Sequence, residues 1–175
     1  MSIDSIVDEV LSKEGGYQNH KADARGNTNS LGVSVGTNHG ISAPVWEKVI
    51  GRPPTVADMK NITKDQARAV YRRDYVDAVT KRYGIKEDNP IFEQVVDMTV
   101  NHSPQAVTSM LQRAYGSKVD GQPGPNTRAA IAAGGDRGNA LVDERSKYYE
   151  QLIRGNPDLG KYRNGWHNRA ESFRR

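Results

Sequence analysis

The stretch Ile3–Tyr17 reads IDSIVDEVLSKEGGY, and it determines how the fold begins. Its apolar residues recur every three or four positions, which is the spacing of a helix with one buried face. These residues are Ile3, Ile6, Val7, Val10 and Leu11. The glycine pair Gly15-Gly16 then supplies residues suited to a left-handed helix end. The stretch therefore predicts an amphipathic helix that ends at Glu14.

Glu14 is placed where the negative end of the helix dipole repels a carboxylate. That repulsion, together with any burial, favours the protonated form of the side chain. A carboxyl group that keeps its proton near neutral pH can act as a general acid. The alternative is an ordinary solvated residue at a helix end, so the surroundings of Glu14 have to decide between the two.

Length and composition limit the classes of protein that the chain can be. Its 175 residues fit one domain, or one domain with two lobes. It has no cysteine, which excludes disulfides, thiolate zinc sites and a cysteine nucleophile. A net charge of +4 favours polyanions such as nucleic acid, anionic lipid or cell wall, without choosing among them. The histidines, His20, His39, His102 and His167, show no metal-binding spacing, so we predict no metal and no cofactor.

The chain changes character after the first helix. Residues 17–42 are rich in Gly, Asn, Ser and Thr, and β-prone pieces such as Leu31–Val35 predict a small hairpin or irregular β lobe. Beyond that stretch, prolines and capping patterns predict helices. These helices should begin near Pro44, Thr55, Thr63, Pro90, Pro104, Asn126 and residues 139 and 159. We therefore predict an α+β fold, predominantly α, with a small β-containing lobe on a helical body.

Asp23 and Thr28 follow Glu14 in the glycine-containing stretch Asp23-Ala24-Arg25-Gly26-Asn27-Thr28. A turn there lets the chain fold back and place both carboxylates on one cleft. Glycoside hydrolysis needs such a pair: one acid protonates the departing oxygen, and the other attacks the sugar or activates a water. The hydroxyl of Thr28 can hold that water. The alternative for Asp23 is a turn residue that bonds its own backbone.

This region resembles the glycoside hydrolase family 108 lysozymes, which are N-acetylmuramidases found mainly as phage endolysins. The resemblance rests on Glu14-Gly15-Gly16-Tyr17, on Asp23, and on Thr28-Asn29 followed by Gly32-Val33-Ser34. It continues through residues 71–78, 97–101 and 111–114. It reaches the Asp-Gly-x-x-Gly-Pro-x-Thr pattern at residues 120–127. The motifs cover most of the chain in the family's order.

The resemblance implies a lysozyme-like fold and hydrolysis of the β-1,4 bond between N-acetylmuramic acid and N-acetylglucosamine. It places the family's catalytic glutamate at Glu14. Asp23 and Thr28 match in type the acid and hydroxyl of phage-type lysozymes, although their spacing here is one residue shorter. After Asn29 the chain has one extra residue and lacks the family's tyrosine. We assign residues 1–89 to a catalytic N-terminal region and residues 90–175 to a helical C-terminal region packed in the same lysozyme-like domain.

Four further residues are candidate contacts to a glycan. Tyr17 and Tyr75 have rings that can stack on sugars, and Asn101 and Gln112 can bond to N-acetyl or carbonyl groups. The alternatives are core packing for Tyr75 and a helix cap for Asn101. We expect Tyr71, one helical turn before Tyr75, to lie in the core.

The segment from Lys161 to Arg175 holds five basic residues and one acid, with Tyr162, Trp166 and Phe173 interleaved. It is either a tail that makes weak contact with an anionic envelope or a last helix packed on the body. We predict peptidoglycan strands as the partner, no nucleic acid, and a monomer. Without the pattern of a secretory signal or a membrane span, the enzyme is expected to be made in a host cytoplasm. It would then reach the periplasmic wall after release by a holin.

Three alternatives to an endolysin-type muramidase stay open at this stage. A lytic transglycosylase needs one glutamate and leaves 1,6-anhydro ends. A non-catalytic peptidoglycan-binding module is suggested by residues 120–127, and it predicts binding without lysis. A nucleic-acid-binding protein is suggested by the basic charge, and it predicts DNA affinity that falls steeply with salt.

Overall fold

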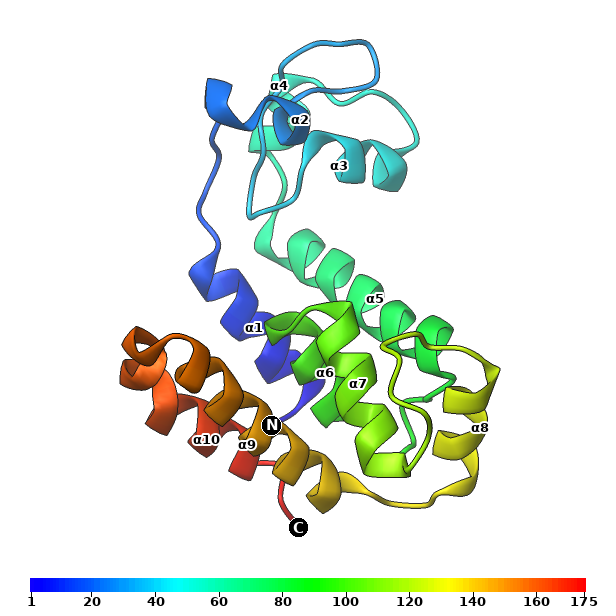
Figure 1. The fold of residues 1–175 in the computed structure, drawn as a ribbon. Coiled ribbons are helices and arrows are strands. Elements are labelled where there is room, and N and C mark those ends of the chain that lie inside the picture. Colours follow the sequence, from blue (N-terminus) through cyan, green and yellow to red (C-terminus); the bar gives the residue numbers. More distant parts are fainter. The chain divides into compact units, whose positions relative to one another are not determined.

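Helical periodicity dominates the sequence, and it dominates the structure. The computed structural model describes residues 1–175. Helices hold 66% of the residues, extended segments hold 3%, and there is no sheet (Figure 1). The predicted α+β class is therefore wrong, and the fold is all-helical.

The segment predicted as a β lobe holds two short helices, Lys21–Asp23 and Ala24–Asn27, and loops with three isolated bridges. The bridges pair Gln18 with Thr37, Thr28 with Ser34, and Asn38 with Ile41. Its local chemistry explains why no ladder forms. The side-chain oxygen of Asn29 accepts hydrogen bonds from the backbone N–H groups of Leu31 and Val33, both at 3.0 Å. A side chain that takes backbone donors in this way competes with strand pairing.

The chain divides into two compact units. The N-terminal unit is Asp4–Arg73, and the C-terminal unit is Asp74–Arg175 together with Met1–Ile3. The N-terminal unit holds most of α1 (Ile3–Lys13), then η1 (Lys21–Asp23), α2 (Ala24–Asn27), α3 (Ala43–Ile50) and α4 (Val56–Lys60). Helix α5 (Lys64–Tyr83) begins in this unit and continues into the C-terminal one.

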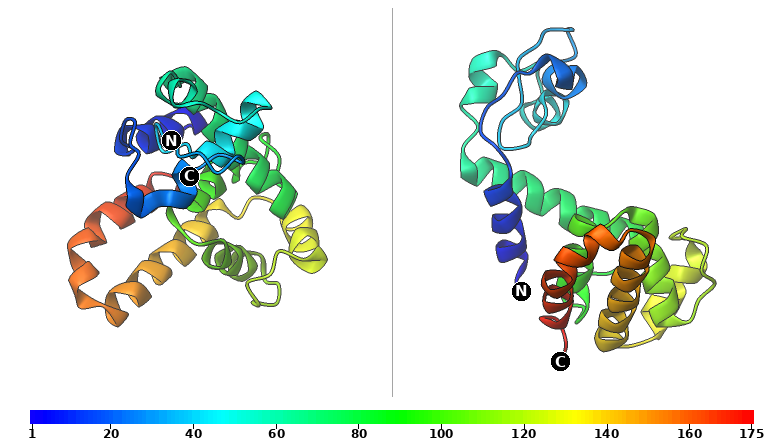
Figure 2. Two further views of the ribbon diagram at one scale, coloured as in Figure 1. Left: turned by 90° about the horizontal axis from the view of Figure 1, so that it is seen from above. Right: turned by 60° about the vertical axis from the view of Figure 1, so that its left-hand side comes forward.

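The C-terminal unit continues with five α-helices and a 3₁₀ helix. They are α6 (Phe92–Asn101), α7 (Pro104–Tyr115), α8 (Pro125–Ala133), α9 (Gly138–Gly155), η2 (Pro157–Tyr162) and α10 (Arg163–Glu171). Helices α9 and α10 pack side by side (Figure 1 and Figure 2). The core of this unit includes Phe92, Val95, Met98, Met110, Leu111, Leu141 and Val142, all at most 1% exposed. None of the helices is both long enough and apolar enough to cross a membrane.

Helix starts follow the predicted capping chemistry. Ser42 and Ser103 cap α3 and α7, each with a proline in the first turn. Thr55 and Asp58 form a capping box at α4. Thr63 and Gln66 exchange the same pair of bonds at the start of α5. Such caps satisfy backbone donors that the first helical turn leaves unpaired, so these starts are determined locally.

Candidate active site

Glu14 follows directly on the last turn of α1, and its backbone N–H donates to the carbonyl of Val10 at 3.1 Å. The residue is exposed, and its carboxylate forms no hydrogen bond or ion pair. It lies against the backbone of Gly40: a Cβ added there would be 2.5 Å from Glu14 Oε2. The carboxyl group of Glu14 is therefore unpaired and packs against the main chain at Gly40.

The main chain beneath Glu14 is a two-residue turn. Asn38 and Ile41 exchange both backbone hydrogen bonds across it, at 2.8 and 3.2 Å. The central residues, His39 and Gly40, have φ values of 51° and 74°. Two successive positive φ values define a type I′ turn, which favours glycine at its second position. Histidine is among the side chains that tolerate the left-handed region. The Nε2 of His39 lies 3.0 Å from the carbonyl of Ile62, which holds the turn in place.

Tyr71 completes this cluster, although we expected it in the core. Its hydroxyl donates to the carbonyl of His39 at 2.9 Å. The same oxygen would be 2.4 Å from a Cβ on Gly40, so it is a close neighbour of the Glu14 carboxylate. No sequence pattern indicates this contact, because the helical spacing from Tyr71 to Tyr75 fits a buried stripe equally well.

Asp23 lies at the junction of η1 and α2 in the same unit. Its carboxylate packs on Gly26, where an added Cβ would be 2.9 Å from both oxygens. The side-chain amide of Gln18 donates to Asp23 Oδ2 at 3.1 Å and to Asn27 Oδ1 at 3.3 Å. Thr37 donates to the same Asn27 oxygen at 2.7 Å. Asp23 is therefore an exposed carboxylate positioned by a polar network whose centre, Asn27, is 1% exposed.

Thr28 lies at the end of α2, and its hydroxyl donates to the carbonyl of Ala24 at 2.6 Å. It lines an open cavity of about 600 Å³ together with Ser30, Glu47 and Lys48. Both candidate acids and Thr28 belong to the N-terminal unit. The hydroxyl hydrogen of Thr28 is used in the bond to Ala24, while the hydroxyl oxygen can still accept a hydrogen bond.

Tyr17, a predicted glycan contact, packs its ring on Gly36, where an added Cβ would be 2.4 Å from the ring. Its hydroxyl donates to the carbonyl of Val35 at 3.0 Å, and Lys60 Nζ lies 5.2 Å from the ring centre. The ring is half-buried, so stacking on a sugar competes with these local contacts.

The other three predicted contacts belong to the C-terminal unit. Tyr75 is half-buried on α5. Asn101 is exposed at the end of α6, and its amide donates to the backbone carbonyl of Asp97 at 2.8 Å. Gln112 is 1% exposed and bonds to Asp120, Gln122 and Thr127. These bonds hold the turn at residues 120–127 together, and contact of Gln112 with substrate stays a prediction.

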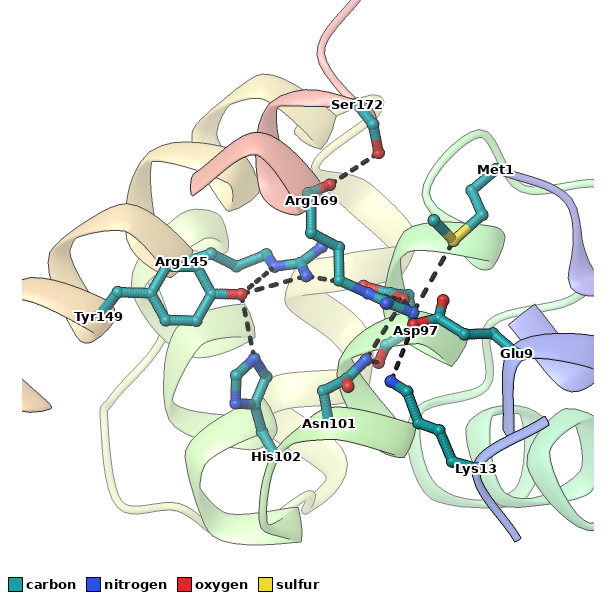
Figure 3. A network of polar contacts seen from close by, with 10 residues as sticks. All are labelled: Met1, Glu9, Lys13, Asp97, Asn101, His102, Arg145, Tyr149, Arg169 and Ser172. Atoms are coloured by element: carbon teal, nitrogen blue, oxygen red, sulfur yellow. Dashed lines mark hydrogen bonds and ion pairs between the residues drawn. The ribbon is translucent and has the colours of Figure 1, made fainter. Parts of the chain in front are cut away.

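Asp97 is the centre of a buried ion cluster in the C-terminal unit. Its carboxylate is 0% exposed and lies 2.7 Å from Arg145 Nη2 and 2.6 Å from Arg169 Nη2. The hydroxyl of Tyr149 accepts a hydrogen bond from Arg145 and lies 3.3 Å from His102 Nε2. Figure 3 draws these contacts as dashed lines. Burial, followed by the charge of Arg145, lowers the pKa of His102 to about 4. His102 is therefore neutral near pH 7.

Basic residues near the C-terminus also have partners. Arg163 pairs with Glu150, and Arg174 pairs with Asp143 and Glu171. Trp166 packs on Tyr149, and Phe173 is buried. These contacts favour the packed last helix over a free basic tail. No group of three or more His, Cys, Asp or Glu side chains is arranged to hold a metal.

Comparison with known families accounts for both halves of the chain. Residues 7–103 match the family model described as Glycosyl hydrolase 108, which includes Glu14, Asp23 and Tyr71. The chain belongs to the glycosyl hydrolase 108 family. Residues 106–171 match a second model, described as Predicted Peptidoglycan domain. The protein is therefore a glycoside hydrolase of lysozyme type that acts on peptidoglycan.

Among solved structures, this glycosyl hydrolase 108 member is similar to SagA of Brucella abortus. The two are 27% identical, the match covers 98% of this chain and 91% of that one, and the TM-score is 0.53. No curated protein sequence matches the chain. The likeness to SagA therefore extends over both units of the chain.

Proposed function

We propose that this enzyme is a muramidase in which Glu14 protonates the glycosidic oxygen between N-acetylmuramic acid and N-acetylglucosamine. The proposal rests on one observation: the carboxyl group of Glu14 forms no hydrogen bond or ion pair, and it packs on Gly40 beside the Tyr71 hydroxyl. A general acid has to be free to donate, and its orientation has to be fixed by its surroundings. Packing against the main chain of Gly40 and against Tyr71 orients the Glu14 carboxyl group.

In this proposal Asp23 is the second carboxylate, within the predicted catalytic region of residues 1–89. It accepts a proton from the attacking water or stabilises the positive charge that develops on the sugar. Thr28 donates its own hydrogen to Ala24, so its oxygen is available to accept the water's other hydrogen. A carboxylate separation of roughly 6.5–9.5 Å in the substrate complex would fit this inverting route, and one of about 5 Å would fit a covalent, retaining route.

Glu14→Gln should lower the rate of hydrolysis by at least about 100-fold, because the amide keeps the shape but cannot donate the proton. The measurement is the loss of turbidity of a peptidoglycan suspension. Glu93→Gln, an exposed change on α6, is the matched control and should hydrolyse at the normal rate. Normal lysis by folded Glu14→Gln would remove Glu14 from the mechanism.

Asp23→Asn tests the second carboxylate separately. The amide retains a hydrogen-bonding oxygen for Gln18 but loses the negative charge, so we expect a rate lower by about 100-fold with unchanged thermal stability. Asp158→Asn, at an exposed site in η2, is the control. Near-normal rates for Asp23→Asn would reduce Asp23 to a loop residue.

The second candidate function is that of a lytic transglycosylase. That reaction requires only one catalytic acid, so it would not need the exposed carboxylate of Asp23. Mass spectrometry of the products separates the two reactions. Reducing muramic ends support the muramidase, and 1,6-anhydro ends would replace it with the transglycosylase.

For the biological setting we propose a phage endolysin, on the family resemblance alone. The enzyme would act as a monomer, wait in the host cytoplasm and reach the wall through a holin, where it would be bacteriolytic. Expression with and without a pore-forming holin tests this setting. Lysis only in the presence of the holin supports it, and lysis by the enzyme alone would contradict it.

A further inference from the structure

The C-terminal unit holds a cavity of about 230 Å³ that hydrolysis by Glu14 and Asp23 does not use. Its lining comes from the end of α6, from α9 and from α10: Asn101, His102, Tyr148, Tyr149, Trp166 and Arg169. Pockets for drug-sized ligands span about 300–1,000 Å³. This cavity therefore fits one substituent of a larger molecule.

A row of rings lines this cavity and continues beyond its lining to Tyr162. Tyr162 stacks on Trp166 at 5.6 Å between centroids, and Trp166 lies 5.4 Å from Tyr149. At the other end Tyr148 meets His102 edge-on at 5.4 Å. Tyr149 is buried, but Trp166 and Tyr148 are partly exposed and Tyr162 is 46% exposed. Partly exposed aromatic faces bind apolar surfaces, and the C–H faces of pyranose rings are such surfaces.

Several polar groups of the lining have no partner. The indole N–H of Trp166, the hydroxyl of Tyr148 and the side-chain carbonyl of Asn101 form no hydrogen bond. His102 is neutral near pH 7 and uses only Nε2, towards Tyr149. Uncharged donors and acceptors between rings are the groups that recognise the acetamido and hydroxyl substituents of a sugar.

Tyr148 also lines a second cavity, of about 450 Å³, between α7 and α9. Arg113, Lys147 and Ser117 lie in its wall. Lys147 pairs with Glu144 at 2.8 Å, whereas Arg113 has no ion pair and the buried hydroxyl of Ser117 has no hydrogen-bond partner. A guanidinium and an orphaned hydroxyl in one cavity fit a carboxylate.

We propose that these two cavities form one peptidoglycan-binding groove, in which the aromatic cavity takes an N-acetylhexosamine and the Arg113 cavity takes a carboxylate of the stem peptide. The proposal rests on the protein acting on peptidoglycan. The match over residues 106–171 names a peptidoglycan domain but no binding residues, and the proposal names them. It does not depend on which residues cleave the glycan.

The test uses Glu14→Gln protein, so that the wall is not degraded, and measures co-sedimentation with two probes fixed to beads: intact peptidoglycan and glycan strands stripped of stem peptides. Trp166→Ala and Tyr148→Ala should each raise the apparent Kd about tenfold for both probes. Arg113→Ala should raise it about threefold for intact peptidoglycan only. Lys118→Ala, an exposed cation outside the cavity, is the matched control and should leave both values unchanged.

Unchanged affinity in folded Trp166→Ala would overturn the sugar site, and equal effects of Arg113→Ala on both probes would overturn the peptide site. If Trp166→Ala does not fold, Trp46→Phe supplies the second measurement, because Trp166 is then the chain's one tryptophan. Its fluorescence should shift when soluble glycan fragments are added, and no shift would overturn the proposal. Retained lysis by Glu14→Gln would instead count against the proposed catalytic acid, so the two failures are distinguishable.

Discussion

Three predicted site residues of the N-terminal unit each rest on a glycine: Glu14 on Gly40, Tyr17 on Gly36 and Asp23 on Gly26. In each pair a Cβ on the glycine would lie within 2.9 Å of the side chain. Such distances are far shorter than the 3.5–4.0 Å of ordinary contact between carbon atoms. The glycines that suggested turns in the sequence therefore also provide the space in which the candidate side chains lie.

Gly40→Ala should lower activity by at least about tenfold, because the new methyl group has to displace the carboxylate of Glu14 or the hydroxyl of Tyr71. The left-handed backbone adds a cost of about 1–2 kcal/mol in stability. Both quantities are measurable, the first by turbidity and the second by denaturant unfolding.

Gly84→Ala separates the two effects. Gly84 has a similar φ of 71° but nothing within 4 Å of an added Cβ. It should lose the same stability while keeping its activity. Equal activity in both alanine variants would show that the contact with Glu14 does not matter.

The residue scale also shows what sequence reasoning can reach. A helix end and a glycine pair, which are local features, predict Glu14 as the acid, and this role stays a prediction. Tyr71 was missed because its role depends on a turn 32 positions earlier in the chain, at His39. A histidine-glycine pair is a weak turn signal by itself, so nothing near Tyr71 indicated the contact.

At the scale of elements, helices were predictable and the loop was not. The stripes and caps that predicted α1, α3, α5 and α7 act within a few residues, and the structure confirms them. The hairpin prediction failed because residues 31–34 stay exposed, with Leu31 72% exposed, and only Val35 of this segment is buried. Strand propensity without a partner strand to bury a face does not produce a sheet.

His102, at the end of α6, makes the stability of the folded protein depend on pH. Its pKa is lowered to about 4 by burial and by Arg145, opposed by Asp97 and assisted by Arg169. An unfolded histidine titrates near 6.5. Between these values the unfolded chain binds a proton that the folded protein does not, so stability falls as the pH drops from about 6.5 to about 4.

We expect this single group to remove about 3 kcal/mol of stability over that range. His102→Gln should flatten the dependence, because glutamine does not titrate. The measurement is the free energy of unfolding by urea at intervals from pH 7 to pH 4. An unchanged slope in His102→Gln would assign the acid sensitivity to other groups.

At the scale of the molecule, the family boundaries and the structural units do not coincide. The glycosyl hydrolase 108 match ends at residue 103, whereas the C-terminal unit begins at Asp74 and runs through it. Helix α6, inside that match, places Asp97 against Arg145 and Arg169, which belong to the second match. The segment that carries the family's signature thus depends on residues outside it for its charge balance.

A fragment of residues 1–103 should therefore fail to fold stably, although it contains the whole glycosyl hydrolase 108 match. Cutting there would strip α7, α9 and α10 from α6 and expose Val95, Val96 and Met98, which are buried in the full chain. It would also remove both arginines that neutralise the carboxylate of Asp97. Burial of one large apolar side chain contributes about 1.5–3 kcal/mol, and total stability of a small protein is only about 5–15 kcal/mol, so the loss of this packing is decisive. Circular dichroism and limited proteolysis of the fragment beside the full chain measure the outcome. A cooperative unfolding transition in the fragment, with proteolytic resistance like that of the full chain, would show that the catalytic family match folds by itself.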